Sequence, residues 1–153
     1  MSSDDYTFGI ERFDSILEEL FPLWREHHNE LVGEQVPLQP DIARYIAVQQ
    51  QGNLVVFSIR DKNNKLCGYS FFFLSKHIHR TQVIKADNDL FFITKSHRKG
   101  WLAKKFIKYC EKKLFNNNIS QIGMRTKNRA SFGPLLEYCG YVPEEQFYLK
   151  VKE

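Results

Sequence analysis

The stretch Asp87–Cys110, DNDLFFITKSHRKGWLAKKFIKYC, sets the architecture of this chain and carries its candidate site. Its apolar run, LFFI at 90–93, predicts a strand that ends at Thr94, and a basic turn, SHRKG at 96–100, follows. An amphipathic helix then begins at Trp101. Because a helix start leaves backbone N–H groups unpaired and carries the positive end of the helix dipole, it attracts anions. The order strand, cationic turn and helix therefore predicts a phosphate-binding site.

Two carboxylates, Asp87 and Asp89, precede the apolar run on the same predicted strand. Regular alternation places them on one strand face with Phe91 and Ile93. A carboxylate beside a phosphate site is a candidate general base, which suggests group transfer from a phosphorylated carrier. Asp89 is the preferred base because Asp87 borders the preceding turn. The structural alternative is that one of the two caps the strand or pairs with Lys85.

Length and composition favour a single domain that spans residues 1–153. The net charge of +4 suits an anionic ligand. Acidic residues are interspersed along the chain, so we do not expect a nucleic-acid-binding stripe. Three cysteines, Cys67, Cys110 and Cys139, lack metal-binding spacing and indicate reduced thiols. The polar N-terminus is unlike a signal peptide, and no apolar run approaches the ~20 residues that span a bilayer. We expect a soluble cytoplasmic protein.

Periodicity predicts helices and strands along the rest of the chain. The helices span 13–30, with a kink or break at Pro22, 41–50, 101–115 and 129–139, and Gly140 caps the last of them. The strands span 54–59, 66–74, 86–93, 121–125 and 146–151, with a hairpin turn at 61–64. A polar crossing with His77 and His79 joins the second strand to the third. This order predicts an α/β fold with a mixed sheet.

The block at 93–114, ITKSHRKGWLAKKFIKYCEKKL, and the order of elements resemble the GNAT N-acetyltransferase superfamily. The central motif of that family reads Arg/Gln-x-x-Gly-x-Gly/Ala, and Arg98-x-x-Trp101-x-Ala103 occupies it here. Trp101 stands where the first glycine belongs, and Gly100 is displaced by one position.

Three further segments extend the resemblance to most of residues 6–152. LLEYCGY at 135–141 is similar to the closing helix of the family. HHNEL at 27–31, GYSFFFL at 68–74 and the His77-x-His79 pair resemble a subgroup that bacteriophages often carry.

The resemblance implies a GNAT fold, a mostly antiparallel sheet with a V-shaped opening where acetyl-CoA or another acyl-CoA binds. Backbone N–H groups of the motif would hold the pyrophosphate: Arg98, Lys99, Gly100, Trp101, Leu102 and Ala103. The strand end at Phe92, Ile93 and Thr94 would pair with the pantetheine amides, and Asn128 would approach the CoA arm. Asp89 or Asp87 would act as the base, and His28 and Glu30 would border the acceptor groove.

The resemblance leaves the proton donor for the departing thiolate open. The family often places a tyrosine four residues before the closing Gly-aromatic pair, and that position here is Leu136. Tyr138 lies two residues later, about 200° around the helix. We therefore expect an acetyl-CoA-dependent N-acyltransferase, with a CoA-binding protein that has lost catalysis as the alternative. A basic nucleic-acid-binding module is the third and weakest hypothesis.

Five histidines invite a metal hypothesis, but two ligands on one strand, such as His77 and His79, do not make a site. We expect no metal. The expected partners are an acyl-CoA donor and an amine acceptor, with no membrane and no nucleic acid, and the resemblance is compatible with a homodimer. A phage-encoded protein would act in the host cytoplasm.

Overall fold

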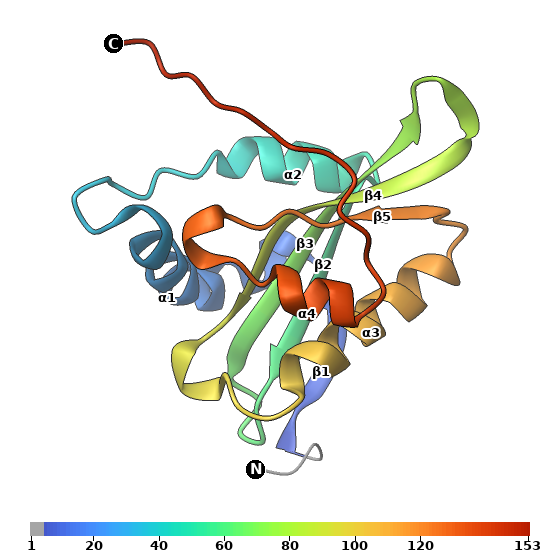
Figure 1. Cartoon of the computed structure of the whole chain (residues 1–153). Helices are drawn as coiled ribbons and strands as arrows, with labels where there is room; N and C mark the ends of the chain where they lie inside the picture. The colour runs from blue at the N-terminus through green and yellow to red at the C-terminus, as the bar shows by residue number, and fades with distance from the viewer. Residues whose placement is uncertain (1–4) are drawn as a thin grey trace.

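A five-stranded sheet forms the centre of the fold in the computed structural model, which describes residues 5–153 apart from the side chain of Arg129 (Figure 1). The strands lie side by side in sequence order: β1 (Thr7–Glu11), β2 (Leu54–Arg60), β3 (Leu66–His77), β4 (Arg80–Ile93) and β5 (Gln121–Gly123). The first four are antiparallel to their neighbours, and β5 is parallel to β4. This confirms the predicted mixed sheet with helices in one α/β unit.

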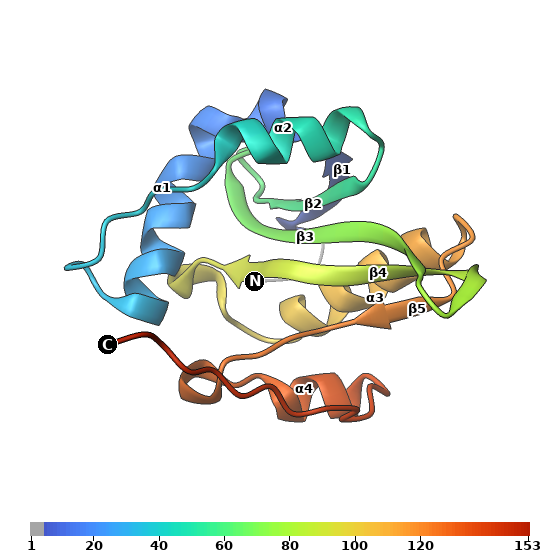
Figure 2. The same cartoon turned by 90° about the horizontal axis from the view of Figure 1, so that it is seen from above.

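Among the residues that the structure describes, four α-helices cover the two faces of the sheet (Figure 2). One face packs against α1 (Phe13–Val32) and α2 (Ile42–Gln50), and the other against α3 (Leu102–Phe115) and α4 (Gly133–Tyr138). Each face has its own apolar cluster, one centred on Phe13, Tyr69 and Phe71, the other on Phe57 and Phe106. None of the helices in the described part of the chain combines the length and apolar character needed to cross a bilayer.

The helix α1 follows its predicted periodicity and continues past Pro22. The apolar positions Ile16, Leu20 and Trp24 are buried, as the 3.6-residue repeat requires. Pro22 removes the N–H that would bond to the carbonyl of Glu18, but both residues are exposed, so water can satisfy that carbonyl. Of the predicted kink or break at Pro22, the break is therefore wrong.

The predicted polar crossing between the second and third strands is instead the tip of a long hairpin. Strand β3 runs to His77 and β4 begins at Arg80, so only Ile78 and His79 lie between them. The ring centroids of His77 and His79 lie 6.0 Å apart at this exposed tip. Among the described residues no group of three or more potential metal ligands comes together.

A β-bulge at Asp89 divides β4 into two parts. Asn88 pairs with Phe72 of β3 and Leu90 with Phe71, so Asp89 is the extra residue. One inserted residue reverses the alternation of every later side chain. The prediction that Asp87, Asp89, Phe91 and Ile93 share a face is therefore wrong.

The carboxyl group of Asp89 and the side chain of Ile93 lie on opposite faces of the sheet. The Asp89 carboxyl group accepts a hydrogen bond from Tyr45 of α2, whereas Ile93 is buried in the cluster beneath α3. The bulge thus turns Phe91 and Ile93 to the α3 side and leaves the Asp89 carboxylate on the α1–α2 side of the sheet.

Other boundaries also differ from the predictions. The five-residue strand β1 was not predicted, and β5 ends two residues earlier than the predicted strand at 121–125. The predicted helix at 129–139 is a 3-10 turn (Asn128–Ala130) followed by α4, which begins near Pro134. Gly140, with φ of 93°, does end that helix, because the Tyr141 N–H bonds to Leu136 O and the Gly140 N–H to Glu137 O.

The predicted strand at 146–151 is also wrong, because this segment has no strand pairing in the structure. Its apolar side chains are exposed: Phe147, Tyr148, Leu149 and Val151.

Candidate functional site

The strands β4 and β5 separate and leave an opening at one edge of β4. Their parallel pairing joins only Lys85–Asp87 to Gln121–Gly123. Beyond Gly123 the chain leaves the sheet, and Figure 2 shows β5 and the segment after it diverging from β4. Within the described residues, 88–93 has no strand neighbour on this side. An extended ligand with amide groups can therefore align with this backbone edge as an added strand would.

The side chain of Asn88 supports the distorted backbone at the bulge. Its amide nitrogen lies 3.0 Å from Ser70 Oγ, 3.1 Å from Phe71 O and 3.0 Å from Leu90 O. Asn88 is buried, and these bonds satisfy groups that the interrupted ladder leaves unpaired. Asn88 was not predicted as a site residue, since a polar side chain in an apolar strand shows its role only once the bulge is known.

The basic turn joins the end of β4 to the start of α3. A 3-10 turn at Lys95–His97 leads to Gly100, whose φ of 59° lies in the left-handed region that favours glycine. Apart from Gly100 itself and its two chain neighbours, no heavy atom lies within 4 Å of the place where a Cβ would stand on Gly100, so the turn borders open space. The N–H groups of Gly100 and Trp101 make no backbone hydrogen bond within the described chain. Together with the first N–H groups of α3, they are available donors at the predicted anion site. The N–H groups of Arg98 and Lys99, which were also predicted for this site, bond instead to Lys95 O and His97 O.

Arg98 turns toward α1 and holds the end of β4 against that helix. Its guanidinium makes two bonds to the Glu30 carboxylate, at 2.8 and 2.7 Å, and its Nε donates to Ile93 O at 2.7 Å. It also lies 5.2 Å from the ring centroid of Phe92. The Arg98 guanidinium keeps the pKa of Glu30 below its usual value. The structure thus brings together two residues that were predicted for different ligands.

His28 also has a partner within the protein. Its Nε2 lies 2.7 Å from Val36 O, which ties α1 to the 33–40 loop. Both His28 and Glu30 are near the C-terminal end of α1 and border the loop that leads to α2.

The neighbouring His27 is buried and was not predicted as a site residue. Its Nδ1 lies 2.8 Å from the Tyr69 hydroxyl, and its ring stacks on Phe92 at 4.6 Å. Burial lowers the pKa of His27 to about 4, so this imidazole is neutral at pH 7.

Asp89 combines solvent access with a crowded carboxyl group. The residue is exposed, but neighbouring protein atoms desolvate the carboxylate and raise its pKa. The hydrogen bond from Tyr45 and the charge of Arg125 oppose that rise. Tyr45 is itself fixed by stacking on Phe13, with ring centroids 5.0 Å apart. An accessible carboxylate with a raised pKa, held by a fixed partner, suits a general base.

Asp87 lies at the closed end of the opening. Its carboxylate forms an ion pair with Lys85 at 3.3 Å, and its backbone pairs with Gly123 of β5. Its Oδ1 stands 2.8 Å from the place where a Cβ would be on Gly123, so a side chain there would collide with it. These contacts match the structural alternative for Asp87, and they leave Asp89 as the carboxylate with the more suitable surroundings.

The other predicted residues are distributed around the opening. Phe92 and Ile93 are buried at the end of β4, and the Thr94 N–H bonds to Cys67 O at 2.9 Å. Leu102 is buried at the start of α3, and Asn128 lies exposed after β5. Lys99 and Trp101 are exposed beside the turn, with Ala103 partly buried one residue into α3.

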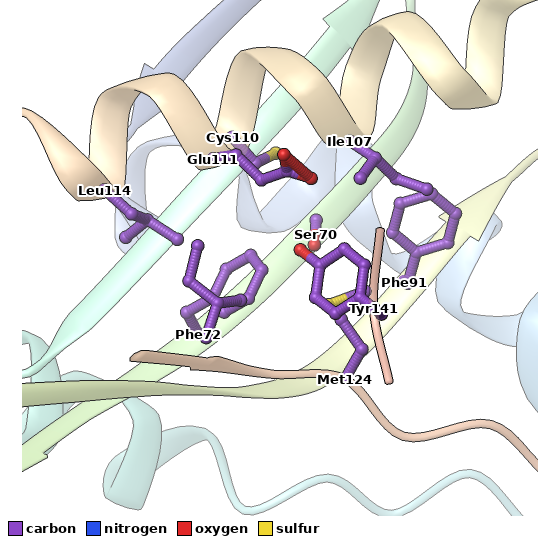
Figure 3. A pocket seen from close by; sticks show the side chains of 10 residues that line it. Ser70, Phe72, Phe91, Ile107, Cys110, Glu111, Leu114, Met124 and Tyr141 are labelled. Carbon is purple, nitrogen blue, oxygen red and sulfur yellow. The ribbon is translucent and has the colours of Figure 1, made fainter. Parts of the chain in front are cut away.

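A small pocket lies beneath α3, between that helix and the strands β3, β4 and β5 (Figure 3). Core side chains line it, and Tyr141 and Glu111 point into the same space. The pocket has no room for a water molecule. Burial raises the pKa of Tyr141, so its hydroxyl stays protonated. We assign this pocket to the packing of α3 and Tyr141 on the sheet.

Comparisons with known proteins identify the fold. No protein-family model and no curated protein matches the sequence. Solved structures do match. A ribosomal-protein-alanine N-acetyltransferase from Brucella melitensis biovar Abortus 2308 superposes with a TM-score of 0.74 at 16% identity, over 97% of this chain and 99% of that one. A GNAT family acetyltransferase from Staphylococcus aureus gives 0.71 at 15% identity, over 97% and 99%. This chain has the GNAT fold.

The similarity to GNAT structures extends over the sheet, its opening and α3. An aminoglycoside acetyltransferase from an uncultured soil sample superposes with a TM-score of 0.76 at 13% identity, over 98% of this chain and 99% of that one. Since the similarity extends over nearly the full length of both chains, the sheet, its opening and α3 belong to one GNAT domain. The resemblance to the bacteriophage subgroup stays a prediction.

Proposed function

We propose that this protein is an acetyl-CoA-dependent N-acyltransferase that moves an acetyl group directly to a primary amine of a small molecule or protein. The observation that carries the proposal is the opening between β4 and β5, which has the N-terminus of α3 at its end and the Asp89 carboxylate at its side. The solved structures with this fold described above are all named acetyltransferases. The two with named acceptors act on an alanine of a ribosomal protein and on aminoglycosides, both of which offer amines.

The donor would lie along β4 and around the turn. The pantetheine arm carries two amides, which suit the free backbone edge of 88–93. Its pyrophosphate suits the N–H groups that follow Lys99, where Gly100 borders open space and Ala103 is small. One anion–dipole contact at an exposed helix start contributes only about 0.3–1 kcal/mol. Several N–H groups and the Lys99 ammonium must therefore act together, since Arg98 is engaged by Glu30.

The chemistry requires a neutral amine. A lysine-like amine with a pKa near 10.4 lies about 3.4 units from pH 7, which adds about 4.6 kcal/mol to the barrier. Asp89 would take the ammonium proton, directly or through a water molecule. The amine nitrogen would then form a bond to the thioester carbonyl carbon, the carbon–sulfur bond would break, and the nitrogen would lose its second proton to solvent. The departing thiolate would receive a proton from solvent, or from a group that the acceptor brings.

A second candidate function is CoA binding without transfer. The position at which the family often has a tyrosine is Leu136, which is buried against Ile107 and Cys139 and has no proton to offer. Trp101 in place of the first motif glycine also favours a protein that binds CoA without transferring the acetyl group. These two departures affect the leaving group and the turn, and they do not remove the base.

Calorimetric titration and a thiol-release assay with acetyl-CoA distinguish the two functions. The enzyme should bind acetyl-CoA and release CoA when amines are added, whereas the binding protein should only bind. Absence of binding would contradict both. Ala103→Glu should abolish binding, because it adds a charged side chain beside the phosphates. Ala47→Glu, the same change at an exposed position of α2, is the matched control and should bind normally.

A further inference from the structure

Two large aromatic side chains stack on the surface beside the proposed pyrophosphate turn. Trp101 precedes α3, and Tyr138 belongs to the last turn of α4. Their ring centroids lie 5.9 Å apart with 25° between the planes. Trp101 is 60% exposed and Tyr138 is 62% exposed, so the pair leaves much of its area in water. Clustered exposed aromatic area of this kind marks binding surfaces more often than single exposed apolar side chains do.

A lysine lies over the same pair. The Nζ of Lys104 is 5.1 Å from the Trp101 ring centroid and 4.7 Å from that of Tyr138, both within cation–π range. Among residues 5–153, no carboxylate lies within salt-bridge distance of this ammonium. The pair therefore combines two flat π surfaces with a positive charge that is available to an anion.

Planar π surfaces beside a cation suit a nucleotide. A purine base stacks on aromatic rings without requiring hydrogen bonds to its edges, and the ammonium can pair with a phosphate on the adjoining ribose. The neighbouring turn strengthens this assignment. Trp101 directly follows Gly100, so a ligand with its pyrophosphate at this turn has its base and ribose close to the pair.

We propose that Trp101, Tyr138 and Lys104 bind the nucleotide end of the acyl donor. The adenine ring stacks on the exposed Trp101–Tyr138 pair, and Lys104 pairs with the phosphate on the ribose 3′ position. This inference rests on the proposed function and names the part of the donor that the pair recognises. It also explains why a tryptophan is tolerated in a turn where small residues are expected, because its side chain points outward and supplies a binding surface.

Truncated donors separate this inference from the proposed function. Affinity is measured by calorimetry for acetyl-CoA, for acetyl-dephospho-CoA, which lacks the 3′-phosphate, and for S-acetylpantetheine, which lacks the nucleotide. Trp101→Ala should weaken acetyl-CoA binding about tenfold, the effect of one stacked base. It should change S-acetylpantetheine binding less than twofold. Lys104→Met should weaken acetyl-CoA binding several-fold and leave acetyl-dephospho-CoA nearly unaffected.

Two variants control for indirect effects. Trp101→Phe retains a stacking ring and should recover most of the acetyl-CoA affinity. Tyr148→Ala removes an exposed aromatic ring from the C-terminal segment, away from the pair, and should bind all three donors as the wild type does. Melting temperatures of all variants should match that of the wild type within a few degrees, because both rings of the pair are largely exposed.

The outcomes test the nucleotide-binding role of the Trp101–Tyr138 pair separately from the proposed acyltransferase function. If Trp101→Ala weakens S-acetylpantetheine as much as acetyl-CoA, the pair only fixes α4 against α3 and the inference is wrong. If Trp101→Ala binds acetyl-CoA as tightly as the wild type, the adenine does not stack there and the inference is also wrong. If the wild type binds none of the three donors, the proposed function fails, and this inference fails with it.

Discussion

Replacing Asp89 with asparagine removes the proposed base at almost constant size. The amide of the new side chain can still accept a hydrogen bond from Tyr45, but it cannot take a proton from an ammonium group at neutral pH. General base catalysis typically contributes 10²–10⁴-fold, so kcat/KM at pH 7 should fall by about that factor. Donor affinity should stay unchanged, since the carboxylate lies on the α1–α2 side of the sheet, away from the turn.

The pH dependence of the variant is the sharper part of the prediction. At pH 7 only about one molecule in 2,500 of an amine with pKa 10.4 is neutral. Without the base, the rate follows that fraction and should rise about tenfold per pH unit up to roughly pH 10. The wild type should instead level off once Asp89 has lost its proton. The two profiles should therefore approach each other at high pH.

Release of CoA, followed with a thiol reagent from about pH 6 to 10, measures both profiles. Asp87→Asn is the matched control, because it makes the same change two residues earlier on β4, at a carboxylate paired with Lys85. It should lose much less activity. A uniform loss at every pH in Asp89→Asn would mean that Asp89 binds the acceptor rather than removing its proton. Unchanged activity would exclude Asp89 from the reaction.

Three further predictions concern neighbouring groups. Tyr45→Phe removes a hydrogen bond that lowers the pKa of Asp89, so the acidic limb of the kcat/KM profile should move to higher pH. If the acidic limb stays at the same pH, this hydrogen bond does not affect the pKa of the base. The pKa of His27 falls from 6.5 to about 4 on folding, so the unfolded chain binds more protons in that interval and stability should drop on the order of 3 kcal/mol as pH falls through it. Urea unfolding should show this loss in the wild type and much less of it in His27→Gln; equal losses would assign it to other groups. Gly100→Ala should lower the free energy of unfolding by about 1 kcal/mol, and Tm by about 2–4 °C, because φ of 59° strains a residue with a Cβ. No further loss is expected, since the added methyl group would meet no neighbouring side chain or backbone atom. A much larger loss in thermal unfolding would contradict the open turn.

Patterns within a few residues of sequence were sufficient to predict the elements that are stabilised by contacts between near neighbours in the chain. The apolar repeat of α1, the turn at 61–64 and the order of strand, basic turn and α3 all follow from periodicity, turn chemistry and helix-start signals within a few residues. The missed β1 and the wrongly predicted strand at 146–151 have a common cause. Whether a short apolar segment becomes a strand depends on a neighbour to pair with: β1 finds β2, and 146–151 has no such partner in the structure.

The stretch Asp87–Cys110 shows where local reasoning stops. Its strand, turn and helix could be predicted from residue order alone, because each depends on side chains close in sequence. The bulge that separates Asp89 from the face of Phe91 and Ile93 could not, since register is set by pairing with β3. Nor could the Arg98–Glu30 ion pair and the Trp101–Tyr138 stack, which join residues 68 and 37 positions apart. The sequence by itself predicted an anion site and two candidate bases, with Asp89 preferred. Only the tertiary structure placed Asp89 against Tyr45, because long-range contacts decide which side chains meet.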